Sequence, residues 1–362
     1  MPQQPSGRAT IHDVAKQAKV STSTVSLVLN GKFDRMRPDT QERVMKAVAD
    51  LGYSTNQMAR ALKTGFVPTI GLVVPTVANP FWGEFARCVE HAAMARNYQV
   101  LLCNAERVPE REQRYVESML ERGIRGVILG SSPLSLKHLS RVTKRGLQVV
   151  AFDRLAESTE GLKLDSVRVD NMLGAKLAIT HLLELGHRRI GFVSGVVSSA
   201  SRRDRLEGYR ATLQAAGITP SADLIWMENV SPTDSEEEAT EIGRVAALSL
   251  LNRPDRPTAL FAINDMTAIG IYAGVRELGL RVPQDVSVVG FDDIHLCRAM
   301  NPPITTVHQP LEALMKSAVG LLIGRMEGRA SPKASQGSAG AEVENITMVP
   351  ELMVRASTAA LR

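Results

Sequence analysis

The segment TIHDVAKQAKVSTSTVS, residues 10–26, predicts the helix-turn-helix that decides the fold of the N-terminal part of the chain. Thr10 followed by Asp13 is typical of a helix start, because the two side chains can each bond the other residue's backbone N–H. Ser21 can begin a second helix that Asn30-Gly31 ends, and residues 38–51 have the apolar spacing of a third helix. In such a head, the second helix enters the major groove of DNA.

The second predicted helix opens with short hydroxyl side chains, which can contact phosphate oxygens or base edges. An alternative interpretation is a plain three-helix core in which the same serines and threonines only cap a helix. The residues of the head that we expect to face DNA are Thr10, His12, Ser21, Thr22, Ser23, Thr24, Ser26 and Asn30.

Charge is distributed unevenly along the 362 residues. Residues 1–63 contain ten of the 43 lysines and arginines but only five of the 38 acidic residues, so the rest of the chain is balanced. A small basic head on a neutral body is suited to phosphate contact, although a solvated basic face without a partner would have the same composition.

Other features of the composition favour a cytoplasmic protein. No apolar run reaches the roughly 18 residues that a membrane span needs, and the polar N-terminus lacks the apolar core of a signal peptide. The three cysteines, Cys88, Cys103 and Cys297, are widely spaced and odd in number, which fits buried thiols in a reducing compartment.

From residue 69 onward, short apolar runs alternate with longer amphipathic segments. The runs include 70–75, 148–152, 190–194, 259–263 and 287–291. This alternation predicts an α/β body with parallel sheets that carry helices on both faces. Because one sheet of ordinary size cannot use about 290 residues, we expect two similar lobes, with ligands bound between them at the C-terminal ends of the strands.

These patterns predict an all-α head with a hinge, followed by a two-lobed core of two doubly wound parallel sheets. We place the head at residues 1–55, the hinge helix and linker at 56–67, and the core at 68–362. We expect the first lobe to comprise about 68–165 and 303–330, and the second lobe about 166–302 and 331–362.

Several motifs in order along the chain resemble the lactose-repressor family, whose core is similar to periplasmic sugar-binding proteins. After the helix-turn-helix come NQMARAL at 56–62, IGLVVP at 70–75, NPFW at 79–82, GHRRI at 186–190, VPQDVSVVGFDD at 282–293 and ITTVHQ at 304–309. The resemblance covers nearly the whole chain. It implies a transcriptional repressor that binds DNA and whose operator affinity a small molecule controls.

The resemblance also implies a hinge helix that orders on DNA and inserts a leucine into the minor groove. A seven-residue helix is marginal alone, so coupling its order to DNA is physically reasonable, and an apolar wedge can kink a duplex. The alternative interpretation is that Leu62 is ordinary apolar surface of a linker. The hinge residues that the resemblance assigns to DNA are Asn56, Ala59, Leu62 and Lys63.

The chain departs from the family pattern in two places. The turn of the helix-turn-helix has Lys19 where the family usually has glycine, and the segment 32–37 is one residue longer than usual. Both departures affect the expected backbone contacts to DNA and leave the predicted fold unchanged.

Polar and aromatic residues follow the predicted strands at positions that the family uses for its effector. Sugars need bidentate partners for adjacent hydroxyls and an aromatic face for the ring. We therefore expect a sugar or sugar derivative. Core packing is an alternative role for Phe81, and we expect Asp265 to cap a helix. The expected ligand-binding residues are Asn79, Phe81, Trp82, Asp153, Arg154, Arg205, Asn264, Asp292 and Gln309.

We expect a homodimer on a near-palindromic operator, because one helix-turn-helix reads one half-site. No cofactor or metal is expected, since the seven histidines are scattered without ligand spacing. A sugar receptor without DNA function and an enzyme on the same scaffold are alternatives. The helix-turn-helix argues against the receptor, and the lack of a nucleophile–base set argues against the enzyme.

Overall fold

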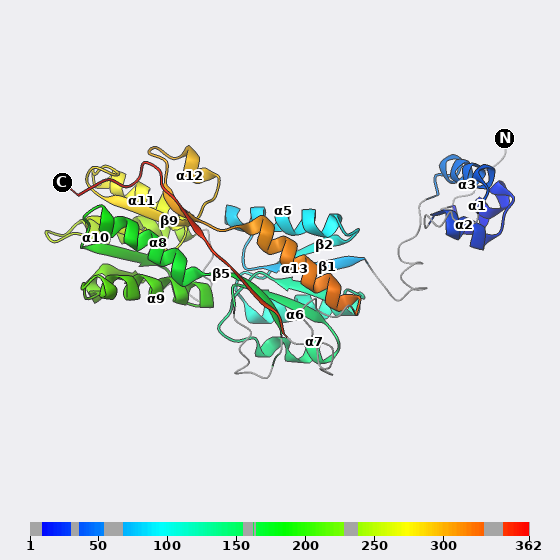
Figure 1. The fold of residues 1–362 in the computed structure, drawn as a ribbon, viewed down its shortest axis with the longest axis horizontal. Coiled ribbons are helices and arrows are strands. Elements are labelled where there is room, and N and C mark those ends of the chain that lie inside the picture. The colour runs from blue at the N-terminus through cyan, green and yellow to red at the C-terminus, as the bar shows by residue number, and fades with distance from the viewer. Residues whose placement is uncertain are drawn as a thin grey trace. The chain divides into compact units, whose positions relative to one another are not determined.

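The computed structural model describes residues 9–29, 36–53, 68–154, 162, 164–227, 238–328 and 343–361. The chain divides into two compact units, residues 1–67 and 68–362. Figure 1 shows both units.

The first unit contains three short helices, as the sequence predicts. They are α1 (Ile11–Ala18), α2 (Thr22–Leu29) and α3 (Pro38–Asp50). Val14, Val25 and Val44, one from each helix, are fully buried and pack together at the centre. Thr10 and Asp13 form the predicted capping box at the start of α1. Lys19 ends α1 in the left-handed conformation, with φ 54°.

The second unit consists of two α/β lobes, each built on a six-stranded sheet. The first sheet has the order β11-β5-β4-β3-β1-β2, and all its strand pairs are parallel. Its strands are β1 (Thr69–Val74), β2 (Gln99–Asn104), β3 (Gly126–Leu129), β4 (Gln148–Phe152), β5 (Asp165–Val169) and β11 (Asn345–Met348). Helices α5 (Pro80–Met94) and α13 (Leu311–Met326) pack side by side on this lobe, which also carries α6 (Pro109–Glu121), η1 (Lys137–Leu139) and α7 (Ser140–Lys144).

The second sheet has the order β12-β10-β9-β8-β6-β7, in which only β12 is antiparallel. Its strands are β6 (Ile190–Ser194), β7 (Ile225–Met227), β8 (Ala259–Ala262), β9 (Ser287–Asp292), β10 (Thr305–His308) and β12 (Glu351–Met353). Helix α8 (Asn171–Glu184) packs against α9 (Ala200–Ala215), and α10 (Glu238–Leu251) packs against α11 (Asp265–Glu277) (Figure 1). The short elements η2 (Ala222–Leu224) and α12 (Leu296–Ala299) complete this lobe.

The second helix pair is unusually close. A Cβ added to Gly270 of α11 would lie 1.9 Å from the Thr240 carbonyl oxygen, and one added to Gly243 of α10 would lie 2.1 Å from the Thr267 carbonyl oxygen. The two backbones therefore touch where these glycines face the opposite helix, and no side chain fits between them.

The chain passes three times between the lobes, and strand pairing corrects the lobe boundaries that we expected. Residues 166–169 belong to β5 of the first sheet, so the first passage lies after Val169. Residues 305–308 form β10 of the second sheet, so the second passage lies just before α13. The segment after residue 343 supplies β11 to the first sheet before β12 joins the second sheet. The expected boundaries at 165, 302 and 330 were wrong because hydrogen-bonded partners, and not the apolar pattern, assign β5, β10, β11 and β12 to a lobe.

No helix in the described ranges is long and apolar enough to cross a membrane.

Candidate effector site between the two lobes

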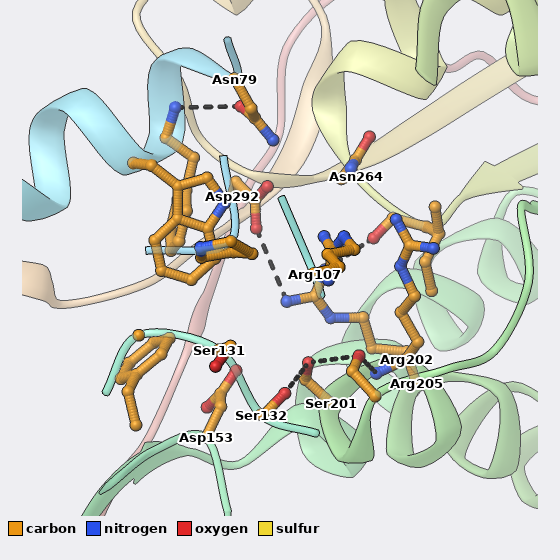
Figure 2. A pocket seen from close by; sticks show the side chains of 17 residues that line it. Asn79, Arg107, Ser131, Ser132, Asp153, Ser201, Arg202, Arg205, Asn264 and Asp292 are labelled. Atoms are coloured by element: carbon orange, nitrogen blue, oxygen red, sulfur yellow. Dashed lines mark hydrogen bonds and ion pairs between the residues drawn. The ribbon is translucent and has the colours of Figure 1, made fainter. Parts of the chain in front are cut away.

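A cavity lies between the two lobes, at the C-terminal ends of the parallel strands. It encloses about 480 Å³ of space between atoms, part of it open to solvent. Figure 2 shows side chains from both lobes converging on it. The first lobe contributes Asn79, Phe81 and Trp82 at the start of α5, Ser131 and Ser132 after β3, and Asp153 after β4; the second contributes Arg202 and Arg205 of α9, Asn264 before α11 and Asp292 at the end of β9.

Arg205 is held by four contacts within the buried wall of the cavity. Its Nε donates to Asn171 Oδ1 at 2.8 Å, and its Nη1 donates to the Ile263 carbonyl oxygen at 2.6 Å. Its Nη2 lies 3.6 Å from Asp292 Oδ1, and its guanidinium carbon lies 3.6 Å from the centre of the Phe291 ring. A planar donor with several fixed partners presents a preorganised charge to the cavity.

The two cavity aspartates occupy backbone conformations that side chains rarely adopt. Asp153 has φ 55° and Asp292 has φ 117°. Such conformations cost free energy and persist where the surrounding structure holds them, often at functional sites. Burial raises the pKa of Asp153 above its usual value, although the Arg205 charge and the hydrogen bonds from Asn171 and the Val169 N–H act in the opposite direction.

The aromatic wall of the cavity is continuous with the core of the first lobe. Phe81 and Trp82 are nearly buried, and their ring centres lie 4.9 Å apart in an edge-to-face arrangement. Both rings also pack near Phe85 and Phe152. Phe81 therefore has the core-packing role that we considered and lines the cavity as well.

The lobes also meet directly beside the cavity, at the loops after β3 and β6. The Ala200 N–H donates to the Ser132 carbonyl oxygen at 2.9 Å, and Pro133 forms an isolated antiparallel bridge with Ser199. Ser201 Oγ lies 3.1 Å from Ser132 Oγ and 3.2 Å from Ser199 Oγ (Figure 2). These hydroxyls join the two lobes by a chain of hydrogen bonds.

Both units of the chain match models of known protein families. Residues 10–56 match the model of bacterial regulatory proteins of the lacI family, and residues 179–358 match a periplasmic binding protein-like domain. The HTH-type transcriptional repressor PurR of Aliivibrio salmonicida is 35% identical over 323 residues, which are 89% of this chain and 93% of the repressor. This chain belongs to the lacI family.

Solved structures of this family extend the similarity to the three-dimensional fold. The lac repressor dimer bound to operator and the anti-inducer ONPF is 27% identical, with a TM-score of 0.82, over 98% of this chain and all of that one. The transcriptional regulator CelR in complex with cellobiose is 29% identical, with a TM-score of 0.68, over 97% of this chain and all of that one. The lacI-family chain described here is therefore a DNA-binding transcriptional regulator, and it is not an enzyme.

Seven of the nine residues that we expected to bind ligand line the cavity of this lacI-family regulator. They are Asn79, Phe81, Trp82, Asp153, Arg205, Asn264 and Asp292. Arg154 instead donates from Nη1 to the Pro133 carbonyl oxygen. Gln309 donates from Nε2 to Asp292 Oδ1 at 2.7 Å and is not among the residues that line the cavity.

The sequence analysis missed several polar residues of the cavity. Arg107, Ser131, Ser132, Ser199, Ser201 and Arg202 also line it. Arg202 precedes Arg205 by three residues on α9, so helical spacing was a signal that could have identified it. The serines lie mostly in loops, where the strand and helix patterns give no signal.

The prediction for Asp265 is also revised. We expected Asp265 to cap a helix, but Asn264 caps α11, with its Oδ1 accepting from the Thr267 N–H at 2.9 Å. Asp265 is buried and accepts from Thr306 Oγ1 at 2.6 Å and from the Ile294 N–H at 2.9 Å. It therefore connects α11 to β10 and to the segment after β9.

In the head, the structure describes seven of the residues that we expected to contact DNA. Thr10, His12, Ser21 and Ser23 are exposed, whereas Thr22, Thr24 and Ser26 are half-buried. Ser21 Oγ accepts from the Thr24 N–H at 3.1 Å and lies 2.7 Å from Ser23 Oγ, so the hydroxyl cluster does cap α2. The remaining predicted DNA contacts lie outside the described residues: Asn30, Asn56, Ala59, Leu62 and Lys63.

Proposed function

We propose that this regulator is a repressor that binds a near-palindromic operator as a homodimer, and that a sugar or sugar derivative in the interlobe cavity controls its operator affinity. The observation that carries the proposal is the convergence of Asp153, Arg205, Asn264 and Asp292 beside two aromatic rings. These four residues come from different strand and helix ends, so their convergence depends on the whole two-lobed fold.

The polar set has the chemistry that vicinal hydroxyls require. Asp153 and Asp292 supply carboxylate acceptors, while Asn264 and Arg202 supply donors. Charged partners that engage two adjacent hydroxyls give strong and directional hydrogen bonds. The Phe81 and Trp82 rings offer an apolar surface to the C–H face of a sugar. The CelR structure with cellobiose supports this class of ligand.

The cavity has walls from both lobes, which suggests how occupancy reaches the DNA. A ligand that contacts both lobes favours one angle between them. If this angle differs between the operator-bound and operator-free dimers, ligand and operator affinities are coupled, and thermodynamic linkage makes the coupling reciprocal.

The DNA-binding proposal rests on the head and its surface. A helix-turn-helix of this size reads one half-site, so two copies related by a two-fold axis fit a near-palindromic site. Ser21 and Ser23 at the start of α2 are exposed, which supports a role in phosphate or base contact. The lac repressor dimer on operator supports the same arrangement.

A ligand screen followed by a linkage experiment tests the proposal. Free pentoses, hexoses and disaccharides, together with purine bases, are added to the full chain and its thermal unfolding is followed. We expect a sugar to raise the melting temperature. The dissociation constant of that sugar is then measured with and without operator duplex. Equal dissociation constants with and without operator would refute the allosteric proposal. Stabilisation by purine bases alone would refute the proposal that the effector is a sugar.

A second experiment separates regulator from receptor. An electrophoretic shift of operator duplex by the full chain should vanish when residues 1–63 are deleted, while sugar binding remains. A shift that persists in the truncated chain would place DNA binding outside the head.

A further inference from the structure

A buried carboxylate lies directly behind the cavity wall. Glu112 of α6 is 2% exposed and does not line the cavity. One of its oxygens, Oε1, accepts from the hydroxyl of Ser131, which follows β3 and does line the cavity. The other, Oε2, lies 2.9 Å from Nε2 of His138 in η1. Each carboxylate oxygen therefore has one partner, and Ser131 is the partner that reaches the cavity.

We propose that Glu112 is a positioning residue that makes Ser131 an acceptor toward the effector, so that the effector must present a hydrogen-bond donor at this point. The proposal rests on the proposed function of the cavity. It adds one requirement for the ligand chemistry: a hydroxyl or N–H group must face Ser131, and an ether or carbonyl oxygen is rejected.

The number of protons in this cluster limits what Ser131 can donate. An ionised carboxylate only accepts hydrogen bonds, and a serine hydroxyl has a single proton and two lone pairs. Because Ser131 donates that proton to Glu112, only its lone pairs remain for the cavity. A hydrogen bond to a buried carboxylate is stronger than one between neutral groups, so a ligand does not readily reverse it.

His138 completes the arrangement on the side away from the cavity. Its side chain is 11% exposed, and it lies 26 residues from Glu112 in the sequence. An acceptor-only carboxylate requires Nε2 of this ring to carry a hydrogen. The second bond fixes the plane of the carboxylate and compensates for burial of its charge, which would be costly if left unpaired.

Other serines of the cavity differ from Ser131 in this respect. The hydroxyls of Ser132, Ser199 and Ser201 bond to one another, and either member of each pair can be the donor. Their polarity can therefore adapt to the ligand. The Glu112 cluster is also unlike a hydrolase triad, because its histidine contacts the carboxylate and not the serine.

The main test measures discrimination between ligand derivatives. The probe is the sugar with the largest thermal shift in a panel that includes D-ribose and cellobiose, compared with its monodeoxy and mono-O-methyl derivatives. In the natural protein, we expect one derivative series, modified at a single hydroxyl, to bind about tenfold more weakly or worse. In Glu112→Gln, the amide nitrogen can donate to Ser131, which frees the serine proton for the ligand. The ratio of the dissociation constants of derivative and parent sugar should therefore fall to about threefold or less.

Two further variants control the test. Ser131→Ala should lose the same discrimination, and the double variant should lose no more than either single variant. Glu110→Gln, on the exposed face of the same helix, should leave the ratio unchanged. If Glu112→Gln folds, as shown by an intact melting transition, and keeps the full ratio, the proposal is wrong. If it does not fold, the Ser131→Ala ratio decides.

A second measurement does not depend on any ligand. Long-range ¹H–¹⁵N NMR of the imidazole rings reports which nitrogen of His138 is protonated. We expect a hydrogen on Nε2 in the natural protein and its retention in Glu112→Gln, where the amide oxygen still accepts from Nε2 while the amide nitrogen donates to Ser131. An unprotonated Nε2 in the natural protein overturns the arrangement. If no compound stabilises the chain, the proposed function fails, while the NMR result still decides whether Glu112 accepts from His138, as the proposal requires.

Discussion

The guanidinium carbon of Arg205 lies 3.6 Å from the centre of the Phe291 ring, so the charge at the cavity wall rests on an aromatic side chain of the core. Stacking of this kind depends on the planar guanidinium, and the same group also donates to Asn171 and Ile263. A lysine ammonium reproduces the charge but not these contacts together.

Arg205→Lys should therefore abolish the response to effector and also lower the stability of the core. We expect the free energy of unfolding to fall by about 2–4 kcal/mol, because Asp292 stays buried with a weaker partner. The only two tryptophans, Trp82 and Trp226, lie in the core, so their fluorescence reports core unfolding in urea. Operator binding should survive at low temperature.

The matched control for that experiment is Arg203→Lys. Arg203 lies on the same helix, but its side chain is 59% exposed, so we expect no measurable change. Full effector response in Arg205→Lys would show that Arg205 does not bind the effector.

Lys19 provides a test of backbone strain in the head. Its φ of 54° is favourable for glycine and costly for other residues. Lys19→Gly and Lys19→Ala remove the same charge, but only glycine relieves the strain. We expect the glycine variant to be more stable by about 1 kcal/mol, measured from circular dichroism melts of the helical head. Equal stability of the two variants would contradict this.

The same pair of variants tests whether the Lys19 charge contacts phosphate. Affinity for a random-sequence duplex is measured as a function of salt concentration. Loss of one phosphate contact should reduce the slope of log affinity against log salt by about one in both variants. An unchanged slope would place the Lys19 charge away from the DNA backbone.

Stability should depend on pH through Asp293 and His308. Hydrogen bonding to Asp293 raises the pKa of His308. Burial alone would raise the pKa of Asp293, but hydrogen bonds from His308 and Arg355 outweigh it and the pKa is lowered. The pair thus stabilises the fold above the unfolded pKa of aspartate, about 4, and below that of histidine, about 6.5. The charge of Glu351 also raises the pKa of His308, whereas the charge of Arg298 lowers it.

His308→Gln should remove this contribution. Because the His308 side chain is 43% exposed, we expect at most about 1 kcal/mol, largest near pH 5 and lost as pH rises through the raised pKa of His308. Urea unfolding followed by tryptophan fluorescence between pH 4.5 and 8 measures the difference. A difference that grows toward pH 8 would have the wrong sign for this mechanism.

The close approach of α10 and α11 predicts a large effect of one added methyl group. Gly270→Ala should destabilise the core by about 3 kcal/mol or more, because its Cβ meets the backbone of the opposite helix. Gly324→Ala in α13 is the control: in the described part of the chain, no atom outside the adjoining turns of its own helix lies within 4 Å of the added Cβ, and helix propensity should stabilise the core by about 0.5–1 kcal/mol. Both values come from urea unfolding.

Much of the site could be predicted because parallel strands end at one edge of each sheet. Asp153 and Asp292 could be predicted because each comes directly after an apolar run that forms a strand. Arg154 was predicted on the same ground, because it follows the same strand, but Asp153 adopts φ 55° and the Arg154 side chain donates to the Pro133 carbonyl oxygen. Gln309 lies at the expected passage between lobes, but its amide supports Asp292.

Edge strands and loop residues were harder to predict. β11 and β12 are short, and their partners lie far away in the sequence, so local patterning does not assign them to a lobe. The hydroxyl of Ser131 is oriented by its hydrogen bond to Glu112, and that of Ser132 by its hydrogen bond with Ser201, 69 residues away. Such contacts arise only from the assembled fold.

The three passages of the chain between lobes have a consequence for synthesis on the ribosome. The three helices of the head are complete by Asp50, but the first sheet lacks β11 until Met348 has been made, and the second lacks β12 until Met353. Neither lobe can finish folding before these strands have been made, whereas the head can fold early. A chain cut short before these strands would therefore keep its DNA-reading helices and lose the means to respond to a signal.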